Sequence, residues 1–150
     1  MIISELFSYP IKGGKYRPHS STILFGTGLA DDRQFLVIDE NDRFVTQRTH
    51  PDLARLQIEL AVTARLVFDG KSVSFPRASR THPQRKVQVW NDQVSAYDLG
   101  EEAAQFLSAQ LGLPLRFCEA MPAGGERQIA NSSAQGKSAD YFFADSAPFL

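Results

Sequence analysis

Residues 65–75 read Arg-Leu-Val-Phe-Asp-Gly-Lys-Ser-Val-Ser-Phe, and this stretch decides the fold class of the chain. Asp69-Gly70 separates two runs of strand-favouring residues, which is among the strongest hairpin signals that a short sequence contains. Strands joined by a tight turn are antiparallel, whereas a parallel pair needs a long crossover. The stretch therefore indicates a sheet built from hairpins and argues against a doubly wound, nucleotide-binding sheet.

Short strand-like runs continue on both sides of this hairpin. They consist of apolar, aromatic or alternating residues bounded by Gly, Pro, Asn and Asp, a pattern that is typical of strands and turns. Residues 53–55 favour a single helical turn, and residues 77–85 favour an exposed polar and basic loop. The predicted strands cover residues 2–9, 20–25, 34–39, 44–48, 56–63, 87–90, 94–97 and 115–119.

One α-helix is predicted near residues 99–111. Asp98 and Glu101 have the spacing of a capping box at its start, and Gly112 with Pro114 supplies an end. Apolar residues between these signals recur on one helical face. Many short strands with a single clear helix predict a mainly β fold: a β-barrel or a strongly curved antiparallel or mixed sheet, with short helical turns.

Composition and charge exclude several classes of function. The chain has 150 residues, of which 43% are hydrophobic and 22% charged, as in one ordinary globular domain. Sixteen Lys and Arg residues oppose 17 Asp and Glu residues, so the overall field favours neither nucleic acid nor an anionic membrane as a partner. No apolar run approaches the roughly 20 residues of a membrane helix. Residues 1–5 lack the features of a signal peptide, so a cytoplasmic location is expected.

Metal ligation and catalysis have little support in the residue pattern. The chain has one cysteine and three histidines without paired ligand spacing, so we expect no metal site. No Ser/His/Asp arrangement marks a nucleophile, and no catalytic residue is predicted. Cys118 alternates within an apolar strand, where a buried thiol is more common than a reactive one. Phe35 and Trp90 are interpreted as core residues.

Two stretches near the N-terminus each combine residues that fix or free the backbone, proline or glycine, with a cationic side chain. Tyr9-Pro10-Ile11-Lys12-Gly13-Gly14 contains a proline and paired glycines, and Gly28-Leu29-Ala30-Asp31-Asp32-Arg33 begins with a glycine. They flank one predicted strand. Such stretches build anion pockets from backbone N–H groups and fixed positive charges, although two surface cations beside ordinary turns would give the same pattern.

Arg48 is a third candidate for this pocket. It ends the hairpin that begins near Arg33, so antiparallel pairing brings the two arginines close together. The alternative is a structural role, in which Arg48 forms an ion pair with Asp31, Asp32 or Asp52. On residue types alone the structural role is favoured.

A series of short motifs carries a resemblance to a known family. In this order they resemble the N-terminal β-barrel domain of MOSC proteins, a family that includes the mitochondrial amidoxime-reducing components and bacterial relatives and that binds molybdenum cofactor. The motifs are Tyr9-Pro10-Ile11-Lys12, Gly28-Leu29, Asp32-Arg33, Asp39, Phe44, Thr46-Gln47-Arg48, Pro51-Asp52-Leu53, Val87-Gln88-Val89-Trp90, Asp98-Leu99-Gly100 and Leu111-Gly112-Leu113-Pro114.

The resemblance implies a role for individual residues. Family members hold the terminal phosphate of the pyranopterin with the cations that correspond to Lys12 and Arg33. A small polar pair usually follows the lysine, whereas this chain has Gly13-Gly14, so a hydroxyl contact is lost while the glycine N–H groups remain as donors. Lys12, Gly13, Gly14, Arg33 and Arg48 are therefore the expected cofactor-binding residues.

The resemblance also implies a domain division. Residues 1–120 correspond to the barrel, residues 121–138 to a flexible loop or linker, and residues 139–150 to a terminal strand or the opening of the MOSC domain itself. In the family that domain carries the cysteine that ligates molybdenum or takes up sulfur. Cys118 does not stand at the matching place.

The expected function is a non-catalytic barrel that helps to anchor the phosphate of molybdopterin. A MOSC domain, in cis or in trans, would carry out the oxidoreductase or sulfur-transfer chemistry, and the molybdenum cofactor is not expected to bind tightly to this chain alone. Two alternatives remain open. In the first, the chain is an interaction module that pairs with a separate MOSC domain through an open C-terminal strand. In the second, it is a barrel that binds another small anionic ligand without molybdenum.

Overall fold

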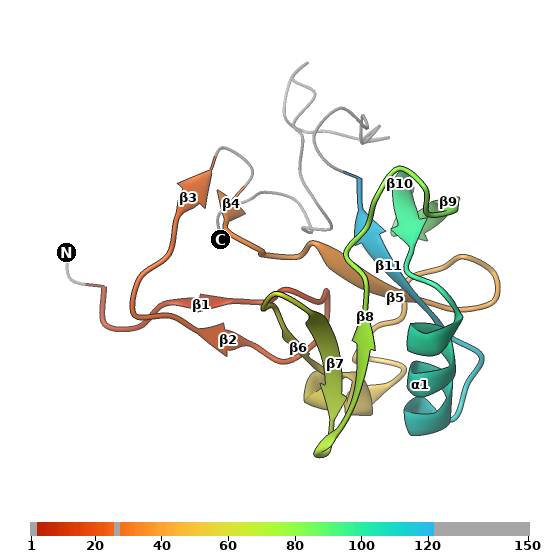
Figure 1. Cartoon of the computed structure of the whole chain (residues 1–150), viewed down its shortest axis with the longest axis horizontal. Coiled ribbons are helices and arrows are strands. Elements are labelled where there is room, and N and C mark those ends of the chain that lie inside the picture. Colours follow the sequence, from red (N-terminus) through yellow and green to blue (C-terminus); the bar gives the residue numbers. More distant parts are fainter. Residues whose placement is uncertain (1–2, 26–27, 122–150) are drawn as a thin grey trace.

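The computed structural model describes residues 3–25 and 28–121 (Figure 1). The predicted terminal stretch 139–150, and all of the predicted linker except Met121, lie outside these residues. Within them, the mainly β fold with one helix is confirmed. Its strands form a curled half-barrel, and the 3₁₀ turn η1 (Pro51–Arg55) confirms the helical turn predicted near residues 53–55.

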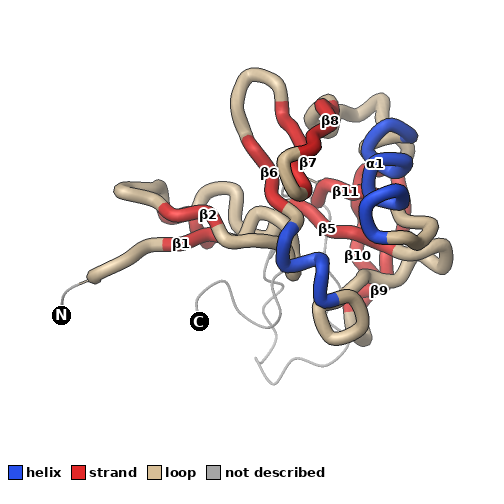
Figure 2. Tube along the Cα trace, turned by 90° about the horizontal axis from the view of Figure 1, so that it is seen from below, coloured by secondary structure: helices blue, strands red, loops and turns tan. Residues whose placement is uncertain are grey.

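Two antiparallel sheets form the body of the molecule. The larger sheet has the order β5-β11-β10-β9, and the smaller one has the order β6-β7-β8. The helix α1 packs against β8 and β11 (Figures 1 and 2). The bounds are β5 (Phe35–Ile38), β6 (Gln57–Glu59), β7 (Ala64–Phe68), β8 (Lys71–Phe75), β9 (Gln84–Val89), β10 (Asp92–Asp98), α1 (Glu101–Leu111) and β11 (Arg116–Ala120).

The hairpin of β7 and β8 turns where the sequence predicts. Phe68 pairs with Lys71 across Asp69 and Gly70, whose φ angles of 49° and 78° are both left-handed. This is the geometry for which Asp-Gly is favoured in two-residue hairpin turns. Every second residue of β7 is buried, so the hairpin presents one apolar face to the core.

A cluster of three phenylalanines joins the two sheets. The ring centroids of Phe35 and Phe117 lie 5.5 Å apart with nearly parallel planes, and Phe75 approaches Phe117 edge-on at 5.3 Å. Phe35 and Phe117 are completely buried. The prediction that Phe35 belongs to the core is confirmed.

Cys118 lies on the opposite face of the larger sheet, in a second apolar cluster with Leu36, Ile38 and residues of β9 and β10. It is completely buried, as predicted. Burial raises the pKa of its thiol to about 12, so almost no thiolate is present at neutral pH. Cys118 is thus a small core residue.

Two arginines from the predicted exposed loop are instead held by buried carboxylates. Arg77 donates to Glu119 from Nε at 2.8 Å, and Arg85 donates from Nε to Asp98 at 2.6 Å. Arg85 belongs to β9, which begins one residue earlier than the loop was expected to end. The sequence reasoning missed these pairs because their partners lie far away along the chain.

The predicted capping box at the start of α1 is wrong. Gly100 is the N-cap residue, and no side chain caps the helix. Asp98 instead accepts hydrogen bonds from the Gly100 N–H at 3.0 Å, from Arg85 and from Arg116. The C-terminal signal is confirmed, because Gly112 adopts the left-handed conformation and its N–H donates to the Ser108 carbonyl at 2.9 Å.

Several predicted strands are shorter than expected. The strand predicted at 56–63 is observed only over Gln57–Glu59. Val62, near its predicted end, is fully exposed and does not pack against the core. The segment 44–48 forms only a bridge from Phe44 to Ile38 before a turn begins at Thr46. Tertiary packing, rather than local strand propensity, sets these lengths.

Trp90 is the clearest error among the predicted core residues. It is the first residue of a two-residue turn between β9 and β10, where Val89 pairs with Asp92. A side chain at this position leaves the sheet, and Trp90 is accordingly 46% exposed.

Residues 3–9 and 16–25 form an N-terminal arm that projects from the body (Figures 1 and 2). Its strands are short: β1 (Phe7–Ser8) pairs with β2 (Arg17–Pro18), and β3 (Leu24–Phe25) pairs with β4 (Gly28–Leu29). Residues 10–15 return from the arm to the body between β1 and β2. No helix in the described ranges has the length and apolar character needed to cross a membrane.

Candidate functional site

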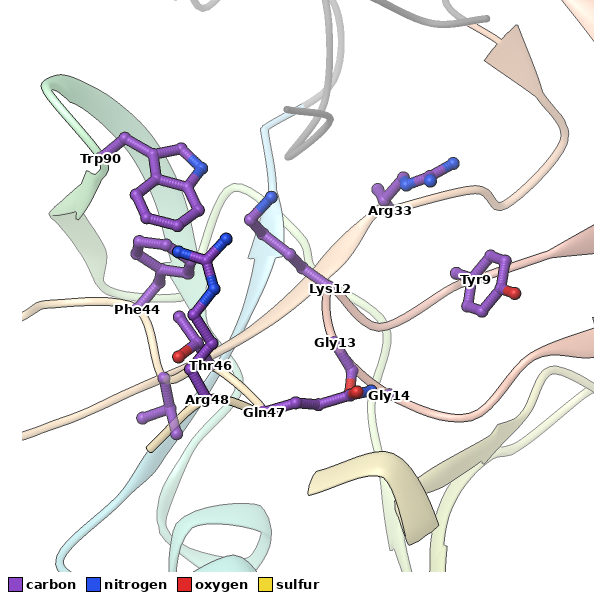
Figure 3. Close-up of a pocket in the computed structure, with 11 residues that line it drawn as sticks. Tyr9, Lys12, Gly13, Gly14, Arg33, Phe44, Thr46, Gln47, Arg48 and Trp90 are labelled. Atoms are coloured by element: carbon purple, nitrogen blue, oxygen red, sulfur yellow. The ribbon is translucent and has the colours of Figure 1, made fainter. Parts of the chain in front are cut away.

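All five predicted site residues line one pocket of about 340 Å³ (Figure 3). The pocket lies where the loop at residues 9–14 meets the segment at residues 44–48 and the turn at Trp90. Its lining comprises Tyr9, Lys12, Gly13, Gly14, Arg33, Phe44, Val45, Thr46, Gln47, Arg48 and Trp90. Three cations and no acidic side chain are among these residues.

Lys12 is held in place by strand β5. Its backbone N–H donates to the Phe35 carbonyl at 2.8 Å, and the Phe35 N–H donates to the Pro10 carbonyl at 2.9 Å. These two bonds make an isolated parallel bridge between Ile11 and Phe35, at the edge of the larger sheet. The Lys12 side chain is buried, and its ammonium nitrogen lies 5.4 Å from the centroid of the Phe44 ring. The charge is therefore carried on a fixed part of the scaffold.

The two glycines are required by the local packing. Gly13 has a φ of 76°, which favours glycine. A Cβ atom on Gly14 would lie 2.8 Å from Cβ of Ile11 and 3.1 Å from the carbonyl oxygen of Leu56. The loop thus lies closer to the core than a side chain at residue 14 would allow.

Only one of the two glycine N–H groups is open to a ligand. The Gly14 N–H donates to the Ile11 carbonyl at 2.9 Å, whereas the Gly13 N–H meets no acceptor among residues 3–25 and 28–121. Gln47 donates from Nε2 to the Gly13 carbonyl at 2.7 Å and steadies the loop. Since Gly13 lines the pocket, its N–H is the candidate backbone donor of this loop.

Arg33 is oriented by its neighbour Asp32. The two side chains form an ion pair, and Asp32 also accepts from the Tyr9 N–H at 2.7 Å. The Arg33 guanidinium carbon lies 5.5 Å from the Tyr9 ring centroid. In Figure 3 the guanidinium points away from the Lys12 ammonium, so Arg33 borders the pocket on the side of the arm.

Arg48 lines the same pocket as Arg33, and the ion pair considered for it is not among the ion pairs of the described residues. Within the described ranges Asp31, Asp32 and Asp52 pair with other arginines and not with Arg48. The Arg48 guanidinium instead lies 5.4 Å from the Trp90 ring centroid. Figure 3 shows it on the same side of the pocket as the Lys12 ammonium.

An aromatic wall was missed by the sequence reasoning. Phe44 and Trp90 meet edge-on with their centroids 4.8 Å apart, and both line the pocket. Asn91 and Asp92 signalled a turn, but the turn begins one residue earlier, at Trp90, and this places the indole outside the sheet. Gln47 lay next to a predicted site residue and was also missed.

The pocket combines features that suit a small anion. Buried positive charge, an open backbone N–H and a lining without carboxylates favour phosphate or a similar dianion. No group of three or more His, Cys, Asp or Glu side chains in the part of the chain that the structure describes is arranged to hold a metal ion.

Comparisons with known proteins agree in pointing to one family. The family model of the MOSC N-terminal beta barrel domain matches residues 1–114. Molybdenum cofactor sulfurase from Drosophila grimshawi is 31% identical over 137 residues, which cover 83% of this chain and 18% of that protein. Mitochondrial amidoxime-reducing component 1 from Mus musculus is 28% identical over 159 residues, covering 99% of this chain and 46% of that protein. The chain thus spans less than half the length of either relative.

A solved structure supports the fold. The solution structure of a Bordetella bronchiseptica protein superimposes with a TM-score of 0.55 at 20% identity, covering 72% of this chain and 94% of that chain. At this level of identity the likeness shows the fold alone.

Proposed function

Because the chain belongs to the MOSC N-terminal beta barrel domain family, we propose that it holds the terminal phosphate of a molybdopterin cofactor in the pocket around Lys12. The observation that carries this proposal is the lining of that pocket, which includes Lys12, Arg33 and Arg48 and no acidic residue. The relatives named above are a molybdenum cofactor sulfurase and an amidoxime-reducing component. The chemistry at molybdenum would belong to a MOSC domain outside this chain.

The residues of the pocket fit a phosphate group. Lys12 supplies a fixed ammonium, Arg48 a guanidinium on the same side, and Gly13 an N–H donor. Hydrogen bonds to charged groups contribute about 1.5–3 kcal/mol each. Arg33 contributes less than its formal charge, because Asp32 already neutralises part of it. We therefore rank Lys12 and Arg48 above Arg33 as phosphate ligands.

Removing the charge of Lys12 tests the proposal. Lys12→Met keeps most of the buried stem and deletes the ammonium, so the affinity for neopterin monophosphate is expected to fall about 10-fold to 100-fold. Amide NMR titration measures this affinity and should show the Gly13 N–H among the most shifted signals in the wild-type protein.

Lys71→Met is the matched control, because Lys71 lies exposed on β8. It should bind the ligand as the wild type does. Equal affinity in the Lys12→Met variant, or shifts confined to residues outside the pocket, would contradict the proposal.

A second candidate function is pairing with a MOSC domain, and the N-terminal arm favours it. Nearly all exposed large apolar side chains of the described ranges lie on this arm, with Val62 and Trp90 as exceptions. A two-stranded ribbon is marginally stable by itself, so its apolar surface suits a covering partner. The arm residues are Ile3, Phe7, Tyr9, Tyr16, Ile23, Leu24 and Phe25. The C-terminal strand first proposed for this pairing lies outside the described residues.

Polar substitutions on the arm test this second function. Phe7→Ser combined with Leu24→Ser is expected to weaken association with a separately produced MOSC domain by at least about 10-fold. Isothermal titration calorimetry measures the affinity. Val62→Ser removes a still more exposed apolar side chain elsewhere and should leave the affinity unchanged. The arm is not the docking surface if both variants bind alike.

A further inference from the structure

Asp32 is a buried carboxylate beside the phosphate pocket. Its side chain is only 8% exposed, and a charge buried to this degree is costly unless it is paired. One carboxylate oxygen, Oδ1, accepts from the Tyr9 N–H at 2.7 Å, and the other, Oδ2, pairs with the Arg33 guanidinium. Asp32 does not itself line the pocket, whereas Tyr9 and Arg33 do. Its effect on a ligand is therefore expected to pass through these two neighbours.

The residues on either side of Asp32 have an unfavourable backbone conformation. Asp31 and Arg33 have φ angles of 60° and 49°, both in the left-handed region. Pairing with Tyr9 holds this conformation, because the Arg33 N–H donates to the Tyr9 carbonyl at 2.8 Å while the Tyr9 N–H donates to Asp32. Backbone strain that the surrounding structure maintains is concentrated at functional sites. The Asp32–Arg33 pair is thus a candidate for a functional arrangement.

Arg33 borders the pocket but is held away from its interior. Asp32 is the only carboxylate that pairs with Arg33 within residues 3–25 and 28–121, and the Arg33 guanidinium carbon lies 5.5 Å from the Tyr9 ring centroid. Figure 3 shows the guanidinium pointing away from the Lys12 ammonium. The Arg33 side chain is 29% exposed, so it is not locked in this direction by a surrounding core.

A carboxylate and a phosphate compete for the same guanidinium. Both present oxygen atoms that accept hydrogen bonds from its planar set of N–H donors. A phosphate that recruits Arg33 must therefore replace Asp32, and the free energy lost with the Asp32–Arg33 pair reduces the free energy of binding. The same phosphate would bind more tightly if Arg33 had no internal partner.

We propose that Asp32 is a positioning residue that holds Arg33 out of the phosphate pocket and competes with bound phosphate for its guanidinium. This inference rests on the proposed phosphate site and gives that site a built-in limit on its affinity. In the bound state, Arg33 leaves Asp32 and turns toward the phosphate. The limit shortens the time for which the ligand stays bound, since affinity differences at one site arise mostly in the dissociation rate.

Asp32→Asn tests the proposal in the full chain, with inorganic phosphate as the ligand. The asparagine carbonyl can still accept from the Tyr9 N–H, whereas its NH₂ group cannot accept from Arg33. The affinity for phosphate is expected to rise about 3-fold to 10-fold. Amide NMR titration at fixed pH and ionic strength measures it. Combining Asp32→Asn with Arg33→Met should abolish the gain, because the released guanidinium is then missing.

Asp31→Asn is the matched control. It removes an equal charge one residue away, from a carboxylate that pairs with Arg17 at 3.6 Å and not with Arg33. Asparagine also tolerates the left-handed conformation of residue 31. Because Asp31 is partly exposed, water and salt screen its charge, and the affinity for phosphate should change by less than about 2-fold.

The Arg33 Nε–H signal provides a second measurement in the wild-type chain, which decides the question even if Asp32→Asn does not fold. The signal is expected to shift when phosphate saturates the site, together with the Gly13 amide. An unchanged Arg33 signal beside a shifted Gly13 amide would mean that Arg33 stays with Asp32, and would overturn the proposal.

Failure of this proposal differs from failure of the phosphate site. The role of Asp32 is overturned, and the phosphate site is kept, if phosphate shifts the Gly13 amide but Asp32→Asn leaves the affinity unchanged or lowers it. The role is also overturned if the gain survives Arg33→Met or if Asp31→Asn produces the same gain. If phosphate shifts the Gly13 amide in neither the wild type nor Asp32→Asn, both proposals fail.

Discussion

Replacing Phe35 by alanine is expected to lower the free energy of unfolding by about 4 kcal/mol, the largest effect of any single substitution considered for this protein. Phe35 is completely buried and stacks on Phe117, with Phe75 edge-on at 6.1 Å. The substitution removes these ring contacts and leaves a cavity where the two sheets meet. Urea denaturation followed by circular dichroism measures the loss.

The same chemical change at an exposed phenylalanine provides the comparison. Phe25→Ala, on the N-terminal arm, should change the free energy of unfolding by no more than about 0.5 kcal/mol, because Phe25 is 53% exposed. Similar losses in the two variants would mean that the phenylalanine cluster does not stabilise the fold as its packing indicates.

Replacing Asp98 by alanine is expected to cost about 3 kcal/mol of stability. The carboxylate is almost completely buried and accepts hydrogen bonds from Arg85, Arg116 and the Gly100 N–H. Its removal leaves two guanidinium groups facing one another without the charge between them. Both arginines are partly exposed, and each has a second carboxylate partner: Arg85 pairs with Asp42, and Arg116 pairs with Glu101. The expected loss of stability is therefore at the lower end of the range for breaking a buried ion pair.

The Asp98 network also makes stability depend on pH. Burial alone would raise the pKa of Asp98, but the hydrogen bonds from Arg116, Gly100 and Arg85 together hold it below its ordinary value. Because the pKa is lower in the folded state, this contribution is complete above the unfolded-state pKa of about 3.9 and is lost as the pH falls through the folded-state pKa. Asp98→Ala should therefore lose stability less steeply than the wild type during acid titration.

An exposed ion pair serves as the control for Asp98. Asp52 pairs with Arg55 at 3.0 Å, yet both side chains are more than half exposed. Asp52→Ala should consequently cost no more than about 1 kcal/mol. The buried network is not a source of stability if Asp98→Ala and Asp52→Ala unfold at the same urea concentration.

The parts of the fold that were predictable from sequence are those with short-range signals. The hairpin turn needs two successive residues in the left-handed conformation, and Asp69-Gly70 suits it; Gly112 likewise suits the left-handed end of α1. Both signals lie within a few residues of the structure that they determine. The extent of the strands was not predictable in this way. Residues 56–63 alternate along their whole length, but only Gln57–Glu59 finds a neighbouring strand.

The residues of the candidate site likewise fall into those that short-range signals identify and those that only the tertiary fold brings in. Lys12, Gly13 and Gly14 are adjacent in sequence, so their grouping needed no tertiary information. Arg48 and Trp90 reach the pocket through the folding of separate segments, and their local patterns were compatible with an ion pair and a core residue. Asp98 is a further example. Its spacing from Glu101 fits a capping box, but in the folded chain the carboxylate is bound by Arg85 and Arg116, which lie more than ten residues away in sequence.

The burial of Cys118 has a practical consequence for work on this protein in solution. Because its pKa is raised and its side chain is completely buried, the Cys118 thiol is almost entirely protonated and shielded from labelling reagents at neutral pH. A cysteine introduced at any exposed position would therefore take up a fluorophore or spin label alone, with the natural thiol left in place. Cys118 need not be replaced before such a label is introduced. Motions of the N-terminal arm can therefore be followed without altering the core of the protein.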